Sequence, residues 1–524
     1  MALSAGRRRG VLFAMCLSLV LVVASVSALN LALGEISVDL GTSSSALTWI
    51  ADGYTVALAA LVLPLGAVGD RRGRRNVLLA GTVVFGLSAL FAVFAGSAGL
   101  LIAARVGMGI GAAMIMPGTL STITAVFPAD KRPTAVALWT AFGGAGAIIG
   151  MLVAGGLLEA FSWRSTFVVT AVLAAVSFVA ALVLAPNTAD KSHGRLDLPG
   201  SALSGIGIGG LVFAIIEGSE KGWTHGLALG GFALAAVGLI GYVVWDLRTE
   251  TPLLDPRLFR LRGFSAGSIA VTMQFLAAFG FFFVGLQFLQ VVLDYSPLLS
   301  ALALVPLVAT IMPVSQLTPR IVDRLGSRTV MATGLGAMAV GFLVLAQLTA
   351  ASSYWEFLGG LVAFGVGMAL AATPATTSIV NSLPLAKQGV ASGMNDATRE
   401  IGSALGIALL GSMFSSGYSD AVAGSTGGLP ADAAHAVSES PAAGLQVAGQ
   451  LGQAGDGLTA AVRTALIDGM SGALTIGAVV LAAAAAVILW RAPRRADEAV
   501  TVDDPDPLIA ELERSLLMDP ELTV

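Results

Sequence analysis

Long apolar stretches alternate with short polar segments along almost the whole chain. A helix needs about 20 apolar residues to cross the hydrocarbon core of a bilayer. Fourteen stretches reach about that length, and they lie at residues 12–33, 47–68, 77–96, 98–120, 134–157, 165–185, 198–217, 227–246, 264–290, 298–317, 330–350, 355–380, 390–417 and 464–490. The pattern predicts an all-α polytopic membrane protein with fourteen membrane-spanning helices.

Positively charged residues support this count, because they gather in every second connecting segment. With the N-terminus placed in the cytoplasm, the cytoplasmic segments include the arginine clusters at 7–9 and 71–75, whereas the opposite loops hold only Arg164, Lys221 and Arg463. Short loops rich in Lys and Arg stay in the cytoplasm. We therefore expect a multi-pass protein of the cell membrane with both termini cytoplasmic. A thirteen-helix count would invert half of the loops.

Composition excludes a water-soluble protein and narrows the chemistry. The chain is 56% hydrophobic and only 11% charged, with a mean hydropathy of +0.87, whereas soluble domains carry roughly 25% charged residues. The single cysteine is Cys16, and the histidines His193, His225 and His435 are scattered through predicted loops. These counts predict neither a disulfide framework nor a metal centre. A phosphate-binding Gly-x-x-x-x-Gly-Lys-Ser/Thr run is also missing, which disfavours an ATP-driven pump.

The second apolar stretch ends in the most distinctive segment of the chain, residues 66–75. It contains Gly66, Asp70, Arg71, Gly73 and Arg74. One interpretation is that its arginines only set the membrane topology, but topology alone would not require the aspartate or the glycine spacing. We favour a conformational latch, in which the Asp–Arg pair docks against neighbouring helix ends and stabilises one state of a moving protein.

A weaker copy of this segment occurs at residues 319–328, where Asp323 and Arg324 follow the second helix of a later group of six. The repeat predicts two related six-helix bundles joined through two additional central helices. The corresponding ranges are 1–186 for the first bundle, 187–263 for the added helices and linkers, and 264–495 for the second bundle.

Two segments are expected to lie outside the membrane. Residues 418–463 contain Ala, Gly, Ser and Asp, and we expect an extracytoplasmic loop that is flexible rather than a folded domain. Residues 496–524 are acidic and are expected to form a cytoplasmic tail.

The 66–75 segment resembles the loop between helices 2 and 3 of the major facilitator superfamily, residue by residue at Gly66, Asp70, Arg71, Gly73 and Arg74. Nearly the whole chain resembles the fourteen-helix drug/proton antiporter branch of that superfamily. The resemblance implies the major facilitator fold, with two six-helix bundles and two inserted central helices. Three further motifs support this resemblance, and they match the family pattern to different degrees.

Arg105 lies about seven residues into the fourth apolar stretch. An arginine at that depth costs roughly 2.5–3.5 kcal/mol on insertion scales, and an ionisable residue inside a membrane is a functional candidate by default. The resemblance implies that Arg105 takes part in proton relay, although Met108 stands where the family often has a glutamine. The alternative is a structural arginine that bonds the backbone of a neighbouring helix.

The start of the thirteenth stretch, residues 389–402, closely resembles the family pattern. Asp396 and Glu400 share a helix face, and Arg399 is placed to neutralise Asp396. Glu400 lies about a third of the way into an apolar helix, where a low dielectric lets a carboxyl group exchange protons near neutral pH. Glu400 is therefore a proton-coupling candidate. A structural ion pair between Arg399 and its neighbours is the alternative.

Asp52, near the start of the second stretch, matches an acidic position in several drug-exporting relatives. It is the third proton-coupling candidate, beside Arg105 and Glu400, unless it only stabilises a helix start at the interface. The family commonly has an aspartate in helix 1, where this chain has Ser25. Either Asp52 and Glu400 then couple transport to protons, or proton coupling is weaker or uses a different mechanism.

The fifth stretch resembles the helix-5 motif associated with antiporters. Gly146, Gly150 and Gly155 match it, but Met151 replaces a proline and Ala154 replaces a glycine. The glycines allow close packing against a helix of the other half. Ordinary small-residue packing explains the same spacing equally well, and the missing proline removes an expected kink.

Polar and aromatic positions on several helices are expected to form a substrate cavity, because amphipathic aromatic pockets suit lipophilic cations. The candidates are Asn30, Tyr54, Gln274, Phe282, Gln287, Asn395 and Asp396. A lipid-facing position is the alternative for any single aromatic residue.

The resemblance implies a secondary transporter rather than an enzyme, which exports lipophilic or cationic drugs or toxic metabolites by alternating access. We expect the proton gradient to supply the energy without a cofactor or metal. The expected partners are the small substrate, protons and the lipid bilayer, with no nucleic acid, and the expected state is a monomer. A narrow-specificity exporter of an endogenous metabolite, antibiotic or lipid is the alternative, because a fold does not determine its substrate.

Overall fold

The computed structural model describes residues 4–42, 44–187, 196–249, 252–384 and 387–493. All regular elements in these ranges are helical. Fourteen of the described helical segments are long and apolar enough to cross a membrane, which confirms the predicted number. The predicted tail at 496–524 lies outside the described residues.

Most of the spans are longer than the predicted apolar stretches, because their helices continue into the flanking polar segments, whereas Arg74–Val93, Arg164–Leu184 and Ser327–Leu345 are not. The first eight are α1 (Ala5–Leu40), α2 (Ser44–Arg72), α3 (Arg74–Val93), α4 (Ala98–Val126), α5 (Arg132–Ala160), α6 (Arg164–Leu184), α7 (Leu198–Lys221) and α8 (Gly226–Asp246). The remaining six are α9 (Arg262–Gln287) with the π-helical turn η2 (Phe288–Val292), α10 (Pro297–Ala303) with α11 (Val305–Leu325), α12 (Ser327–Leu345), α13 (Tyr354–Asn381), α14 (Gln388–Val422) and α17 (Asp456–Arg491).

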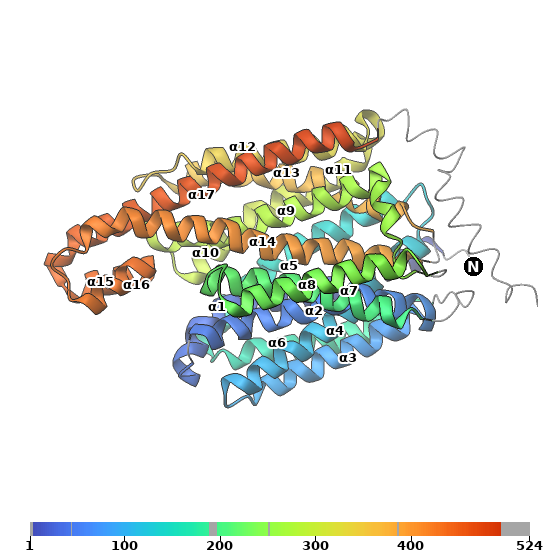
Figure 1. Ribbon diagram of the computed structural model, residues 1–524, viewed down its shortest axis with the longest axis horizontal. Coiled ribbons are helices and arrows are strands. Elements are labelled where there is room, and N and C mark those ends of the chain that lie inside the picture. The colour runs from blue at the N-terminus through green and yellow to red at the C-terminus, as the bar shows by residue number, and fades with distance from the viewer. Residues whose placement is uncertain (1–3, 43, 188–195, 250–251, 385–386, 494–524) are drawn as a thin grey trace, which may run out of the picture.

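The spans run roughly side by side and pack in two groups (Figure 1). In the first group, α4 packs against α2 and α3, α1 against α5 and α6, and α3 against α6. In the second group, α9 and α12 pack against α13 and α17, and α14 packs against α9 and α17. The groups meet where α2 and α4 contact α14 and where α5 contacts α11. A space between the groups is thus bounded by helices of both.

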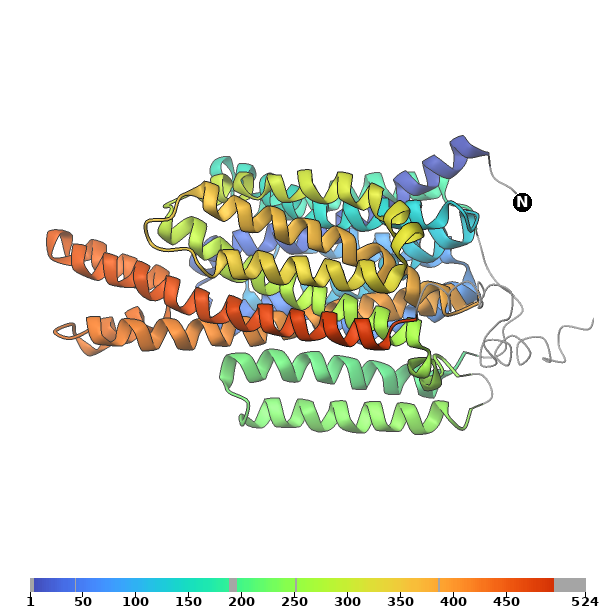
Figure 2. The same cartoon turned by 90° about the horizontal axis from the view of Figure 1, so that it is seen from above.

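The helices α7 and α8 lie along one side of the bundle, with α8 outermost (Figure 2). α7 packs against both α2 and α14, so it contacts each of the two groups. Glycines make this close approach possible, because a Cβ on Gly205 would lie 2.9 Å from the Ala60 carbonyl oxygen and one on Gly209 2.7 Å from the Ala60 Cβ. In the inserted pair, α7 therefore packs directly against α2 and α14.

Residues 418–463 do not form the flexible segment that their composition predicts. α14 continues beyond the other helices, α15 (Ala431–Glu439) and α16 (Pro441–Gln450) follow, and α17 returns to the bundle, as Figure 1 shows at its left end. The Tyr418 hydroxyl donates to the Val437 carbonyl oxygen at 2.8 Å, and Val437 and Val462 are fully buried. The prediction is wrong because an alanine-rich segment has high helix propensity and needs only a few apolar anchors to pack.

Candidate functional site

A cavity of about 1010 Å³ lies between the two helix groups. Its lining comes from α1, α2, α4, α5, α7, α9, α11, α13 and α14. α1 and α7 contribute only their C-terminal halves and α2 its N-terminal half, so the cavity occupies the end of the bundle opposite the 66–75 turn. We call these the cavity end and the turn end. Asn30 and Glu220 are both exposed at the mouth of the cavity.

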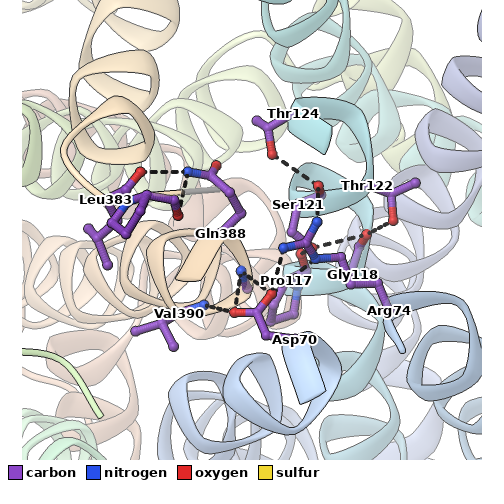
Figure 3. A network of polar contacts seen from close by, with 12 residues as sticks. Asp70, Arg74, Pro117, Gly118, Ser121, Thr122, Thr124, Leu383, Gln388 and Val390 are labelled. Atoms are coloured by element: carbon purple, nitrogen blue, oxygen red, sulfur yellow. Dashed lines mark hydrogen bonds and ion pairs between the residues drawn. The ribbon is translucent and has the colours of Figure 1, made fainter. Parts of the chain in front are cut away.

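At the turn end, Asp70 joins the two helix groups. Its carboxylate accepts hydrogen bonds from the backbone N–H of Gly389, at 2.8 Å to each oxygen, and from that of Val390 at 3.2 Å (Figure 3). These donors belong to the first turn of α14, where N–H groups have no partner within the helix and the dipole favours a negative charge. Arg74 donates to the same carboxylate at 2.8 and 3.0 Å and to the Ser121 carbonyl oxygen at 3.3 Å. Asp70 and Arg74 are each only 5% exposed.

Glycines permit this contact between α2 and α14. A Cβ on Gly66 would collide with the Gly389 carbonyl oxygen, and one on Gly389 would collide with the Gly66 carbonyl oxygen and the Asp70 carboxylate. Gly73 connects α2 to α3 with φ at 99°, a conformation that residues with a side chain rarely adopt. Arg71 is partly buried at the end of α2.

Gln388 fixes the start of α14 against the end of α13. Its side-chain amide donates to the carbonyl oxygens of Val380 and Leu383, both at 2.9 Å (Figure 3). The first turn of α14, whose N–H groups donate to Asp70, is therefore fixed to α13 through Gln388 and to α2 through Asp70. Sequence analysis missed Gln388, although its position directly before the α14 motif was a signal.

The repeat of this segment, at residues 319–328, is more exposed than the 66–75 turn in the same state. Asp323 and Arg324 lie at the end of α11 and are exposed, in contrast to the buried Asp70 and Arg74. The structure therefore has one docked turn and one exposed turn at the same end of the bundle.

Arg105 is 1% exposed and lines the cavity from α4. Its Nε donates to the Ile50 carbonyl oxygen at 3.0 Å and its Nη2 to that of Ala51 at 3.4 Å. The guanidinium carbon lies 4.6 Å from the centre of the Tyr54 ring. Nη1 has no hydrogen-bond partner among the described residues. Arg105 thus bonds the backbone of a neighbouring helix, as a structural arginine would. Its Nη1 group remains available as a hydrogen-bond donor among the described residues.

Asp52 lines the cavity one residue after these two carbonyl groups. Thr48, one helical turn before Asp52, donates from its hydroxyl to the Glu220 carboxylate at 2.7 Å. Glu220 belongs to α7 and also lines the cavity. Sequence analysis missed this residue, because the acidic end of α7 resembled an ordinary helix terminus.

The charged residues of α14 divide between the cavity and the protein interior. Arg399 and Glu400 line the cavity, and the guanidinium carbon of Arg399 lies 4.5 Å from the centre of the Phe275 ring and 5.4 Å from that of Trp139. Asp396 is fully buried behind them, with one carboxylate oxygen 3.5 Å from Arg399 Nη1. The ion pair that sequence analysis left as an alternative is therefore present, between Arg399 and Asp396.

Five of the seven residues expected in the cavity line it, and two do not. Those that line it are Asn30, Tyr54, Gln274, Phe282 and Gln287. Asn395 and Asp396 have no exposed surface and are absent from the lining, so their expected position is wrong for this state. The α14 face that reaches the cavity begins only with Arg399 and Glu400, because the helix is closed against α2 before that point.

Ser25 occupies the position of the helix-1 aspartate without replacing its chemistry. Its hydroxyl donates to the Val22 carbonyl oxygen at 2.8 Å, and the residue is buried outside the cavity lining. A carboxylate therefore reaches the cavity from α2, α7 and α14 but not from this position of α1.

The helix-5 glycines pack mainly within their own group, which corrects the expected partner. A Cβ on Gly150 would collide with the backbone of Ala24 in α1, and one on Gly146 would lie 3.3 Å from the Val20 Cα. Of these three glycines, Gly155 faces the other group, where a Cβ would lie 3.3 Å from the Leu298 Cα of α10. The spacing therefore serves close packing of α5 against α1 and, at one point, contact between the groups.

Comparison with known proteins agrees with this architecture. Residues 15–407 match the Major Facilitator Superfamily. The chain is 32% identical over 479 residues to the multidrug efflux pump LfrA of Mycolicibacterium smegmatis, covering 90% of this chain and 94% of that protein. It is 32% identical over 399 residues to the methyl viologen resistance protein SmvA of Salmonella typhimurium, covering 75% of this chain and 80% of that protein.

A solved structure, that of the human organic anion transporter MFSD10, superimposes with a TM-score of 0.63 at 14% identity, covering 92% of this chain and 99% of that one. At this identity the similarity concerns the fold alone. The sequence match, which extends over most of the chain and is supported by relatives of similar length, shows that the protein belongs to the Major Facilitator Superfamily.

Proposed function

We propose that this protein is a proton-coupled exporter of lipophilic, predominantly cationic compounds, working by alternating access. One observation carries the proposal: the cavity at one end of the bundle contains three carboxylates, Asp52, Glu220 and Glu400, among aromatic and aliphatic side chains. Such a cavity attracts cations that also have apolar surface. Efflux by LfrA and methyl viologen resistance through SmvA, the functions in their names, agree with this substrate class.

The membrane orientation that we propose rests on the charge pattern. The arginine clusters at 7–9 and 71–75 favour a cytoplasmic turn end and cytoplasmic termini, and in that orientation the cavity faces outward. In this state Asp70 holds α14 against α2 and closes the cytoplasmic side. Release of that contact would let the two bundles, residues 1–186 and 264–495, rock apart and open the cavity inward.

We assign proton coupling to Glu400, Asp52 and Arg105. Glu400 lines the cavity, and the neighbouring Arg399 forms its ion pair with the buried Asp396. A carboxyl group in this setting binds a proton when the cationic substrate leaves and loses it when the substrate returns. The proton gradient then supplies the energy. Because a single chain encloses the cavity, we further propose that the monomer is the working unit.

The experiment is ethidium efflux from energised cells, with and without a protonophore, for the native protein, Glu400→Gln and Asp52→Asn. Efflux that stops with the protonophore and in Glu400→Gln supports proton-coupled export through this residue. Efflux that survives both substitutions would place coupling elsewhere. Absence of efflux for every cationic dye, despite normal amounts in the membrane, would contradict the proposal and favour a narrow exporter of a metabolite, antibiotic or lipid.

A further inference from the structure

The inserted helix α7 takes part in the cavity, although it belongs to neither six-helix bundle. Its last turns contribute Ile216, Ser219 and Glu220 to the lining. The Glu220 carboxylate accepts the Thr48 hydroxyl at 2.7 Å, which fixes it beside α2. An acidic side chain from the insertion therefore lies on the path that the substrate takes.

Glu220 and Asp52 are neighbours in this part of the cavity. Thr48 and Asp52 are one turn apart on the same face of α2, and Glu220 contacts Thr48. The two carboxylates therefore lie on the same part of the cavity wall. The adjacent Lys221 does not lie in the lining, because Glu217 holds its ammonium at 2.9 Å.

Glu220 gives the cavity lining more acidic than basic side chains. The charged residues of the described lining are Asp52, Arg105, Glu220, Arg399 and Glu400. Without Glu220 there are two acids and two arginines, and with it there are three acids. The balance is more negative still, because the buried Asp396 lies 3.5 Å from Arg399 and offsets part of its charge.

A second observation indicates that the same cavity is built for a ligand. Tyr54 lines the cavity, is only 2% exposed and has a phenol oxygen without a hydrogen-bond partner among the described residues. Leaving a buried hydroxyl unpaired costs about 1–3 kcal/mol. A ligand group that reaches this hydroxyl from the cavity would remove this cost.

We propose that Glu220 and Asp52 form an anionic pair that binds the charged groups of the exported cation, and that α7 thereby makes the transporter prefer cations, most of all dications. The proposal rests on the proposed export function and adds the residue that sets its charge preference. A pair of adjacent carboxylates is fully compensated by two positive charges and only half compensated by one.

The test changes the charge at one position of the same folded protein. Glu220→Cys is made together with Cys16→Ala, because Cys16 is the only native cysteine. Intact cells are treated with a membrane-impermeant methanethiosulfonate that carries either a sulfonate or a trimethylammonium group. Efflux of methyl viologen, a dication, and of ethidium, a monocation, is then measured.

We expect Glu220→Cys to lower methyl viologen efflux about tenfold and ethidium efflux about threefold at limiting substrate. The sulfonate reagent should restore both rates in large part, and the trimethylammonium reagent should reduce them further. The same treatment of Glu356→Cys, an exposed acid at the start of α13 outside the cavity, should have no effect on either probe.

Equal effects of the two reagents, or an unchanged ratio between dication and monocation, would overturn the proposal, because a structural role depends on size rather than sign. If Glu220→Cys does not reach the membrane, Ser219→Lys places a positive charge at the neighbouring lining position and must show the same selective loss. Native protein that exports neither probe would refute the proposed function itself, a result distinct from efflux that ignores the charge at position 220.

Discussion

Asp70→Asn should shift the protein away from the outward-facing state by weakening the contact that closes the cytoplasmic side. The native carboxylate accepts two backbone N–H groups of α14 and two N–H groups of Arg74. Hydrogen bonds to a charged group contribute about 1.5–3 kcal/mol each, and a charge at a buried helix N-terminus up to about 2 kcal/mol. An asparagine keeps one acceptor oxygen but loses the negative charge.

We therefore estimate that the substitution destabilises the closed cytoplasmic side by about 3 kcal/mol, which corresponds to roughly 100-fold in the equilibrium between the two states. A protein that was almost entirely outward-facing would then populate the inward-facing state substantially. Transport should slow, because the cycle can no longer close the inner side efficiently.

The assay is a distance measurement between spin labels at Asn76 in α3 and Leu325 in α11, both exposed at the turn end of opposite bundles. Asp70→Asn should add a longer-distance population. Asp323→Asn is the matched control, because its carboxylate is exposed in this state and its neutralisation should leave the distribution unchanged. Identical distributions for native protein and Asp70→Asn would refute the latch, even if transport were lost.

Other substitutions test separate parts of the structure. Gly389→Ala should abolish efflux without lowering the amount of protein in the membrane, because its Cβ would collide with Gly66 and Asp70; normal efflux would disprove the need for this close approach. Arg105→Lys should reduce efflux about tenfold despite the retained charge, since an ammonium does not reproduce the two bonds to α2 carbonyl groups; native rates would show that charge alone suffices. Tyr418→Phe should weaken α15 by about 1 kcal/mol, seen as faster amide exchange near Val437, with unchanged efflux; slowed efflux would instead link this segment to transport.

Local patterns were enough to predict much of the architecture. The length and hydrophobicity of each stretch determine whether it can cross the bilayer. The fourteen spans could therefore be counted without knowing how they pack. The charge and glycine spacing of 66–75 likewise indicated a docking turn, and the structure places Asp70 on a helix N-terminus. The equivalent Asp323 is exposed in this state, and its sequence alone does not say how deeply a turn is buried.

Other features depended on contacts that a single segment does not encode. The alanine-rich 418–463 segment looked flexible, yet contacts such as that of Tyr418 with Val437 hold it in helices. The α5 glycines indicated a close approach, but only the packing shows that Gly146 and Gly150 face α1. Spacing on α14 placed Asp396 and Glu400 on one face, whereas the approach of α2 buries the former and leaves the latter in the cavity.

The sequence by itself thus determined the membrane character of the chain, the number of its helices and the residue types available for binding a cation, because burial in lipid is a property of each segment. The tertiary structure alone decided which charges meet. Glu220 comes from an inserted helix far along the chain, and it reaches Thr48 and the neighbourhood of Asp52 only because Gly205 and Gly209 let α7 pack against α2. Contacts of this kind depend on how two helices are rotated and how far apart they lie. Small residues at the interface determine both, and the sequence of one helix does not reveal its neighbour.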